Sequence, residues 1–477
     1  MESFMEPLKL ELKTLYATGL TIVINGQQQQ CKAVWICGVY DTIARAWIMC
    51  MKQFNAVGVP GHSTAGCCKC NHCAERKGSK TVYPYTKTRT LRDHDSVFDA
   101  LMDKEFSESD SDIEFDSTDM EDNQSLQTDA CFKGISILWS IPGYSFFVST
   151  VVDPMHCIWE GVVKQFLKRW FAQNHSKQMG SQRSKLRKFD KLLQKIKLPS
   201  EYHRNFRSFE DHGAYWKAIE FRYFLLIAFP CIMDKVLPMD LFNHFMLLVK
   251  AITDVSQYTV KRTSVENVEK NLELFCELTP KLYGTEFESF NLHQLLHIVM
   301  DIINFGPLWT HSAFVFESLN HDILKMCHGT RKLLEQVHWS FKVASTLSKY
   351  GVQTDDDVDN TGTEQFNEFV FKFNLRPAEL GHALKKKLKT HARLQNALES
   401  DKVVLTSKKL TLRTKCYDEK RTCSDHCVVF SGNRSGLIER LFLVTYSNNT
   451  KKALAEIRYL DWKRNVTSST TQVTVST

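Results

Sequence analysis

Near the start of the chain, β-forming runs separated by a turn signal give way to a helical spacing of apolar residues. Residues 20–24 and 33–39 are rich in β-forming side chains and flank the Asn-Gly pair at 25–26, so we expect strands there. Over residues 43–54 apolar side chains recur every three or four positions, which predicts a helix. Asp41 lies between the second strand and this helix. The carboxyl end of a strand is a common place for catalytic groups in α/β folds.

Farther along, the pattern changes twice. From Asp153 to residue 350 the chain reads as predominantly helical, and the segments 216–229 and 238–253 are apolar enough to be interior. A polar break follows, with a lysine-rich helix expected over residues 384–396. Beyond residue 402 short β-like runs separated by glycines predict a small β domain, at 403–406, 410–413, 427–430 and 441–446.

These boundaries predict an α+β protein in six regions. The first, residues 1–92, contains the strand, acid and helix unit and a cysteine-rich loop. Residues 93–130 include an acidic run that cannot bury enough apolar area to fold independently, so we expect a disordered insertion. Helices fill 131–350, residues 351–401 form a linker with a basic helix, 402–465 form the β domain, and 466–477 form a disordered tail.

Composition limits the class of protein. The chain has 477 residues, of which 43% are hydrophobic, enough for two or three cores, since a single core seldom exceeds roughly 250–300 residues. The formal net charge is +7, but the charges are unevenly distributed along the chain. The acidic run carries mostly negative charge, so the rest of the chain is strongly basic. That remainder is compatible with nucleic-acid binding or simply with solubility. The chain shows neither a signal peptide nor the about 18 consecutive apolar residues of a membrane span.

The cysteines give the most specific chemical signal. Without a secretory signal, the 15 cysteines indicate reduced thiols and metal ligands in a cytosolic or nuclear compartment. Two overlapping Cys-x-x-Cys pairs occur, Cys67 with Cys70 and Cys70 with Cys73, and either could bind zinc through two thiolates. Free thiols or a redox pair are the alternatives. Spacing alone leaves the register open.

A second pair of zinc-type ligands lies far downstream. His293 and His297 are four residues apart, so a helix would place both imidazoles on one face, where they could complete a Cys2His2 tetrahedron. The alternative is two partly buried histidines within a core helix.

Two further acids lie in helical segments. Asp153 precedes Pro154, which is typical of a helix start and favours a capping role, and His156 either faces an active centre or packs beneath it. Glu317 is surrounded by Phe314, Phe316 and Leu319. It is either a metal ligand or the polar side of an amphipathic helix.

These residues belong to a longer series of motifs that follow one another in a fixed order along the chain. The series resembles transposases of the CACTA (En/Spm) group over residues 5–340. It comprises Tyr40-Asp41-Thr42-Ile43-Ala44-Arg45-Ala46, Lys52-Gln53-Phe54-Asn55, Gly66-Cys67-x-x-Cys70-x-His72, Tyr83-Pro84, Arg89-Thr90, Asp153-Pro154-Met155-His156, Trp216-Lys217-Ala218-Ile219-Glu220 and Gly306-Pro307.

The resemblance implies a fold and a site. It predicts an RNase H-like catalytic core, partial in this chain, interrupted by a large all-helical insertion. Asp41 becomes the second catalytic carboxylate and Glu317 the third, with Mg²⁺ as the catalytic cofactor in DNA strand cleavage and transfer. Structural zinc is bound by Cys67, Cys70, His293 and His297, which selects the first register of the cysteine pair.

The same resemblance implies double-stranded DNA as partner, a homo-oligomeric assembly and a nuclear location. The family's first acid lies upstream of the second, but the residues before Asp41 contain Glu2, Glu6 and Glu11 and no Asp. We therefore expect the carboxyl-terminal part of a transposase, lacking the family's N-terminal DNA-binding region and catalytically incomplete. The alternatives are a non-enzymatic zinc-stabilised protein that binds DNA or a protein partner, and a plain zinc-stabilised scaffold.

Overall fold

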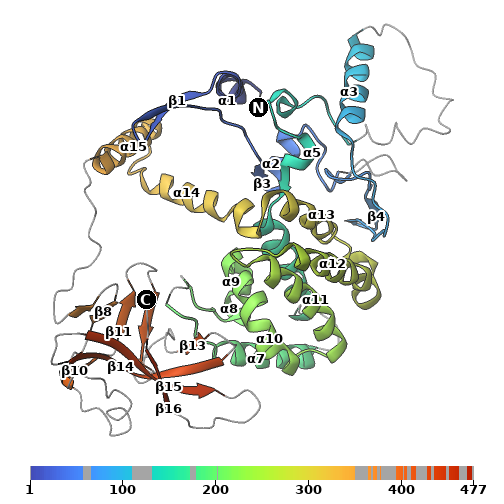
Figure 1. Ribbon diagram of the computed structural model, residues 1–477. Helices are drawn as coiled ribbons and strands as arrows, with labels where there is room; N and C mark the ends of the chain where they lie inside the picture. Colours follow the sequence, from blue (N-terminus) through green and yellow to red (C-terminus); the bar gives the residue numbers. More distant parts are fainter. Residues whose placement is uncertain are drawn as a thin grey trace. The chain divides into compact units, whose positions relative to one another are not determined.

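The computed structural model describes most of the first 349 residues and ten short stretches beyond them. They are 2–56, 66–109, 131–171, 179–200, 202, 204–349, 364–366, 369–372, 376–377, 394–400, 402–405, 410–414, 427–430, 434–446, 451–460 and 470–474. The chain forms two compact units: Met1–Phe189 with Ala214–His338, and Asp190–Gly213 with Trp339–Thr477. Helices dominate the first unit and strands the second (Figure 1), so the predicted α+β class is confirmed.

An antiparallel hairpin follows the first helix. Helix α1 (Glu2–Ala17) leads into β1 (Leu20–Ile24) and β2 (Gln27–Cys31). Asn25 and Gly26 between them have φ angles of 53° and 77°, the left-handed values required by a two-residue type I′ turn. The strand predicted at 20–24 and its turn are confirmed. The strand predicted at 33–39 is wrong for residues 33–37, because a two-residue turn pairs Ile24 directly with Gln27 and the partner strand ends at Cys31.

The first unit contains a sheet of two short parallel strands. Strand β3 (Gly38–Tyr40) pairs with β6 (Thr150–Val152), and Tyr40 stands opposite Val152. The next residue after each strand is an aspartate, Asp41 after β3 and Asp153 after β6. Because the strands are parallel and in register, both acids lie at the same edge of this sheet.

The helix after Asp41 is shorter than predicted. Helix α2 (Thr42–Ile48) begins directly after the acid but ends before residue 54. Cys50 has a φ of 52°, and Met51 then forms an antiparallel bridge with Phe132. A left-handed residue cannot continue an α-helix, so the chain turns at Met49 and Cys50 and the apolar residues beyond them pack outside the helix.

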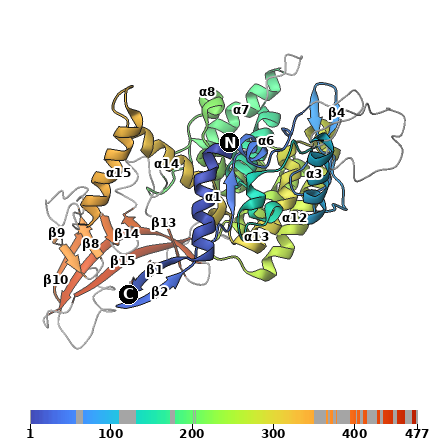
Figure 2. The ribbon, with the colours of Figure 1, turned by 90° about the horizontal axis from the view of Figure 1, so that it is seen from above.

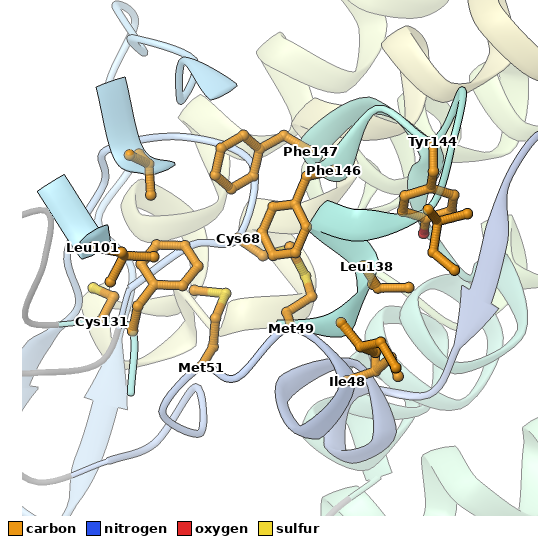
Figure 3. Packing of buried hydrophobic residues seen from close by; sticks show 14 residues of the cluster. Ile48, Met49, Met51, Cys68, Leu101, Cys131, Leu138, Tyr144, Phe146 and Phe147 are labelled. Carbon is orange, nitrogen blue, oxygen red and sulfur yellow. The ribbon is translucent and has the colours of Figure 1, made fainter. Parts of the chain in front are cut away.

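Helix α3 (His94–Ser109) occupies the start of the segment predicted to be disordered, so that prediction is wrong for these residues. Val97 and Leu101 are four residues apart and therefore share one face, where they are 5% and 1% exposed. They belong to a cluster with Phe132 and Phe146, and Figure 3 shows Leu101 beside Cys131 at one side of it. The acidic composition hid this single buried stripe. Residues 110–130 lie outside the described residues.

The described residues between 131 and 349 are mostly helical, as predicted. The elements are η1 (Ile137–Ser140), α5 (Phe146–Ser149), η2 (Met155–Val163, π-helical), α6 (Lys164–Phe171), α7 (Met179–Leu193), α8 (Phe209–His212), η3 (Gly213–Tyr215), α9 (Ala218–Tyr223), η4 (Phe224–Ala228), α10 (Phe229–Ile232), η5 (Met233–Lys235), α11 (Met239–Val255), α12 (Arg262–Tyr283), η6 (Thr285–Phe287), α13 (Phe290–Phe305), η7 (Leu308–His311), α14 (Phe314–Lys325) and α15 (Leu333–Lys349). Helices α11, α12 and α13 are successive neighbours (Figure 1), and Figure 2 also shows α12 beside α13. Within the described part of the chain, no helix is long and apolar enough to cross a membrane.

Aromatic side chains hold these helices together. Phe166 of α6 is fully buried, and its ring centroid lies 4.9–5.3 Å from those of Phe245, Phe275, Tyr283 and Phe287. Rings at such separations gain edge-to-face attraction in addition to the burial of their surface. The packing confirms the predicted interior character of the segment around Phe245.

The second unit contains two antiparallel sheets. One runs in the order β16-β15-β14-β10-β9, with β13 also paired to β14, and the other runs β12-β11-β8-β7. The strands are β7 (Glu364–Phe366), β8 (Phe369–Lys372), β9 (Arg376–Pro377), β10 (Leu394–Ser400), β11 (Lys402–Leu405), β12 (Leu410–Arg413), β13 (Cys427–Phe430), β14 (Arg434–Tyr446), β15 (Lys451–Leu460) and β16 (Thr470–Thr474). The predicted β character beyond residue 402 is confirmed.

Three sequence-based boundaries in this unit are wrong. Strands β7, β8 and β9 lie inside the predicted linker, and β10 takes the end of the predicted basic helix, because Leu394 pairs with Tyr446 of β14. Strand β16 lies in the predicted disordered tail. Its Thr- and Val-containing sequence favours a strand, and its backbone pairs antiparallel with the edge of β15. The polar break at 355–362 and residues 384–393 lie outside the described residues.

A pair of substitutions tests whether α3 is packed as described. Leu101→Ala removes a fully buried side chain and is expected to lower the free energy of unfolding by about 2–5 kcal/mol. Asp99→Ala, on the exposed face of the same helix, is expected to change it by less than about 0.5 kcal/mol. Chemical denaturation measures both. Equal effects, together with unprotected amides over residues 94–109, would show that α3 does not dock on the cluster.

Candidate metal centre

The cysteine-rich loop forms a tight turn that buries two thiols. Antiparallel bridges join Gly66 to Cys73 and Cys70 to Leu91, and the Cys67 amide donates to the His72 carbonyl at 3.0 Å. Cys67 and Cys70 have no exposed surface. The loop thus directs both thiols into the protein, as metal binding by a Cys-x-x-Cys turn requires.

Helix α13 supplies the second pair. Its N-cap is Ser289, whose hydroxyl accepts from the Leu292 amide at 3.3 Å, so the first histidine follows just inside the helix. His293 and His297 lie on one face, are each 3% exposed, and have their Nε2 atoms 3.3 Å apart. The predicted placement of both imidazoles on one helical face is confirmed.

The two pairs meet in one buried cluster. Cys67 Sγ lies 3.4 Å from His297 Nε2, and Cys70 Sγ lies 3.4 Å from His293 Nε2. All four ligand atoms lie within 4.8 Å of one another. A tetrahedral zinc ion with Zn–N of about 2.0–2.1 Å and Zn–S of about 2.3 Å separates its ligand atoms by about 3.3–3.8 Å, so the donor set fits such a metal.

The structure also resolves the register of the cysteine pair. Cys67 and Cys70 face the histidines, whereas the Cys73 thiol hydrogen-bonds with that of Cys131. This contact lowers the pKa of Cys73 to about 6, against the opposing effect of burial. The alternative pairing of Cys70 with Cys73 is therefore wrong for this cluster.

Neighbouring groups favour the ligand forms of these side chains. Burial opposes ionisation of Cys67, yet hydrogen bonds from the Cys68 and Cys70 thiols and the two nearby imidazoles lower its pKa well below the usual value. The Gln294 amide and the Lys69 backbone N–H donate to Cys67 Sγ at 3.2 and 3.3 Å. Burial lowers the pKa of His297, which favours the neutral imidazole that binds metals.

A buried ion pair connects this centre to the parallel strands. Lys69 Nζ lies 2.8 Å from Asp301 Oδ1, with side chains 8% and 0% exposed. The other carboxylate oxygen of Asp301 accepts from the Val152 amide at 2.7 Å, at the end of β6. This pair was not identified from the sequence, although Asp301 continues the four-residue spacing of His293 and His297 along α13.

The two aspartates at the strand edge differ in their surroundings. Asp41 is exposed and caps α2, with Oδ1 accepting from the Ala44 amide at 2.7 Å. Asp153 is 3% exposed and accepts from the amides of Met155, His156 and Ala313 at 3.1, 3.1 and 2.8 Å. The capping role predicted for Asp153 is confirmed, and the bond to Ala313 also fixes the start of α14.

Glu317 lies on α14, in the first turn after Ala313. Its side chain is 60% exposed, and its Oε1 lies 3.8 Å from His156 Nε2. Its flanking side chains Phe316 and Leu319 are also exposed, and no residue of α14 is buried, so the helix does not show the buried apolar face that the amphipathic alternative assumes. In the part of the chain that the structure describes, neither Asp41 nor Glu317 belongs to a group of three or more His, Cys, Asp or Glu side chains placed to share an ion.

Metal content with three variants tests the centre. The purified chain is expected to contain about one zinc ion, and Cys67→Ser and His297→Ala are expected to lose it together with thermal stability, because four ligands complete the shell. Cys73→Ser is the matched control and should retain zinc, since this thiol faces Cys131. Zinc that survives His297→Ala, or is lost in Cys73→Ser, would contradict the ligand assignment.

The buried ion pair makes a separate prediction for zinc-loaded protein. Lys69→Met leaves the Asp301 carboxylate buried without its cation and is expected to cost about 3–5 kcal/mol of unfolding free energy. Adding Asp301→Asn should recover part of this loss, because the charge is then removed. Exposed Lys80→Met serves as control. Urea denaturation gives the three values, and a cost below about 0.5 kcal/mol for Lys69→Met would refute the pairing.

Comparison with protein-family models finds none that matches this chain, and comparison with curated proteins finds no match either. The functional conclusion therefore depends on the buried Cys2His2 cluster and on the acids at the strand edge.

Proposed function

We propose that this chain is a transposase-derived protein of the CACTA type, with a zinc-stabilised RNase H-like core interrupted by a helical insertion. The single observation that carries the proposal is the Cys2His2 cluster, which joins thiols and imidazoles 223 and 230 residues apart. Asp41 precedes the thiol loop and Glu317 follows the imidazole helix. One zinc ion would thus fasten both ends of the helical segment between the two acids.

The parallel pair of β3 and β6 supports the same proposal. An RNase H-like core places its acids at the carboxyl ends of neighbouring strands, and Asp41 occupies that position. Glu317 lies near the same edge, because His156 contacts both Asp153, which follows β6, and Glu317. We propose that Asp41 and Glu317 are the carboxylates that face the DNA backbone.

The chemistry proposed for this edge is hydrolysis and transfer of phosphodiester bonds. Asp41 and Glu317 present exposed oxygen donors, the ligand type that Mg²⁺ prefers, and would hold that ion. When bound, Mg²⁺ would activate a water or 3′-hydroxyl nucleophile and stabilise the leaving oxygen. Asp41 Oδ1 already accepts from the helix α2 backbone, which fixes the direction of its carboxylate.

Among the described residues at this strand edge, Asp41 and Glu317 are the two exposed acids. Asp153, the neighbouring acid, is buried and takes its hydrogen bonds from three backbone amides and His156, so it is not available as a further metal ligand. We therefore propose that the chain alone binds double-stranded DNA in the nucleus, as a homo-oligomer, without cleaving it. The alternative function, non-enzymatic binding to DNA or to a protein partner, is favoured by the same observation.

DNA binding and nicking measured on one preparation test the proposal. Affinity for a short duplex is expected to fall steeply with salt, because phosphate contacts release counterions. Supercoiled plasmid with Mg²⁺ or Mn²⁺ is expected to remain intact, and Asp41→Asn and Glu317→Gln should bind DNA as the parent does. Nicking that both variants abolish would establish an active enzyme instead. Absence of salt-dependent DNA binding would overturn the proposal.

A further inference from the structure

The carboxylate of Asp153 holds His156 in a fixed orientation. His156 Nδ1 lies 2.5 Å from Asp153 Oδ2, and the same oxygen accepts from the His156 backbone amide at 3.1 Å. Asp153 itself cannot turn away, because its other oxygen accepts from Met155 and Ala313. An ionised carboxylate can only accept, so Nδ1 is the donor and carries hydrogen.

With Nδ1 occupied, Nε2 is the remaining nitrogen of His156. It lies 3.8 Å from Glu317 Oε1, and the His156 and Glu317 side chains are 29% and 60% exposed. One nitrogen and one carboxylate oxygen therefore lie side by side at an accessible edge. His156 belongs to η2 and Glu317 to α14. Asp153 connects these two elements, because its carboxylate accepts hydrogen bonds from Met155 and Ala313.

This arrangement matches the way proteins prepare a histidine to bind a metal. Metal-ligating histidines almost always donate their other ring N–H to a carboxylate, which fixes the tautomer and the ring direction. Asp153, His156 and Glu317 supply the carboxylate, the imidazole and a second ligand in that order. Imidazole also changes metal preference, since Mg²⁺ favours oxygen ligands while Mn²⁺ also binds in mixed glutamate and histidine sites.

We propose that His156 Nε2 and Glu317 are two ligands of one divalent-cation site of the Mn²⁺ class, and that Asp153 is the positioning residue that orients the imidazole. This inference rests on the proposed function, in which Glu317 holds the catalytic ion. It extends that function by adding a nitrogen ligand that the acids alone do not provide. Asp41, as proposed above, together with water and DNA phosphate oxygens would complete the coordination of the ion.

Mn²⁺ binding to zinc-loaded protein, followed by electron paramagnetic resonance, tests the inference without requiring activity. The bound Mn²⁺ spectrum should show ¹⁴N coupling from one imidazole. His156→Ala should abolish this coupling and weaken Mn²⁺ binding at least about tenfold, and Asp153→Asn should weaken it about 10- to 100-fold. His321→Ala is the matched control, because His321 is exposed one helical turn beyond Glu317 and should change neither quantity.

The outcomes separate the inference from the proposed function. Zinc content and thermal unfolding of each variant establish that the fold is intact, and Asp153→Asn keeps the test available where His156→Ala does not fold. Mn²⁺ binding that Glu317→Gln abolishes but that shows no imidazole coupling would overturn the inference and leave the proposed function standing. Mn²⁺ binding indifferent to both Asp41→Asn and Glu317→Gln would overturn the proposed metal site and the inference with it.

Discussion

The first unit depends on a contact between side chains that are more than two hundred residues apart. Cys67 and Cys70 meet His293 and His297 in a buried cluster. Cross-linking even a 100-residue loop removes about 4.7 kcal/mol of chain entropy from the unfolded state. A metal ion shared by these four ligands would therefore constrain the whole helical segment, at an apparent binding free energy of about 10–16 kcal/mol.

The cluster also positions what lies around it. The Lys69–Asp301 ion pair links the thiol loop to α13. Asp301 also accepts a hydrogen bond from the Val152 amide, which links α13 to the end of β6. Asp153 is the next residue after Val152. Its carboxylate caps the following helical segment and accepts a hydrogen bond from Ala313, the residue before α14. The strand edge is thus built on a chain of buried polar contacts, in which each carboxylate oxygen has a partner. Buried polar groups are stable only under that condition.

Spacing alone predicted one Cys-x-x-Cys pair and the His-x-x-x-His pair as candidate zinc ligands, because each motif imposes a geometry on two donors. It could not choose between the overlapping cysteine pairs, since that choice depends on which thiol faces α13 and which faces Cys131. The pairing of β3 with β6 was equally inaccessible, because the strands have three residues each and lie far apart in the chain. Local composition gave the wrong prediction for α3, because two buried apolar residues hold this helix in place although its surface is acidic. It gave the wrong prediction for β16 as well, because pairing with the edge of β15 orders this strand.

The proposed function is assigned to the strand edge, and it requires that the metal cluster hold this edge in place. The most direct measurement is X-ray absorption at the zinc edge of the purified chain. The structure predicts a first shell of two sulfur atoms at about 2.3 Å and two nitrogen atoms at about 2.0–2.1 Å. A shell of three or four sulfur atoms, or an absence of zinc, would mean that the thiol loop does not share an ion with α13, and would contradict the account.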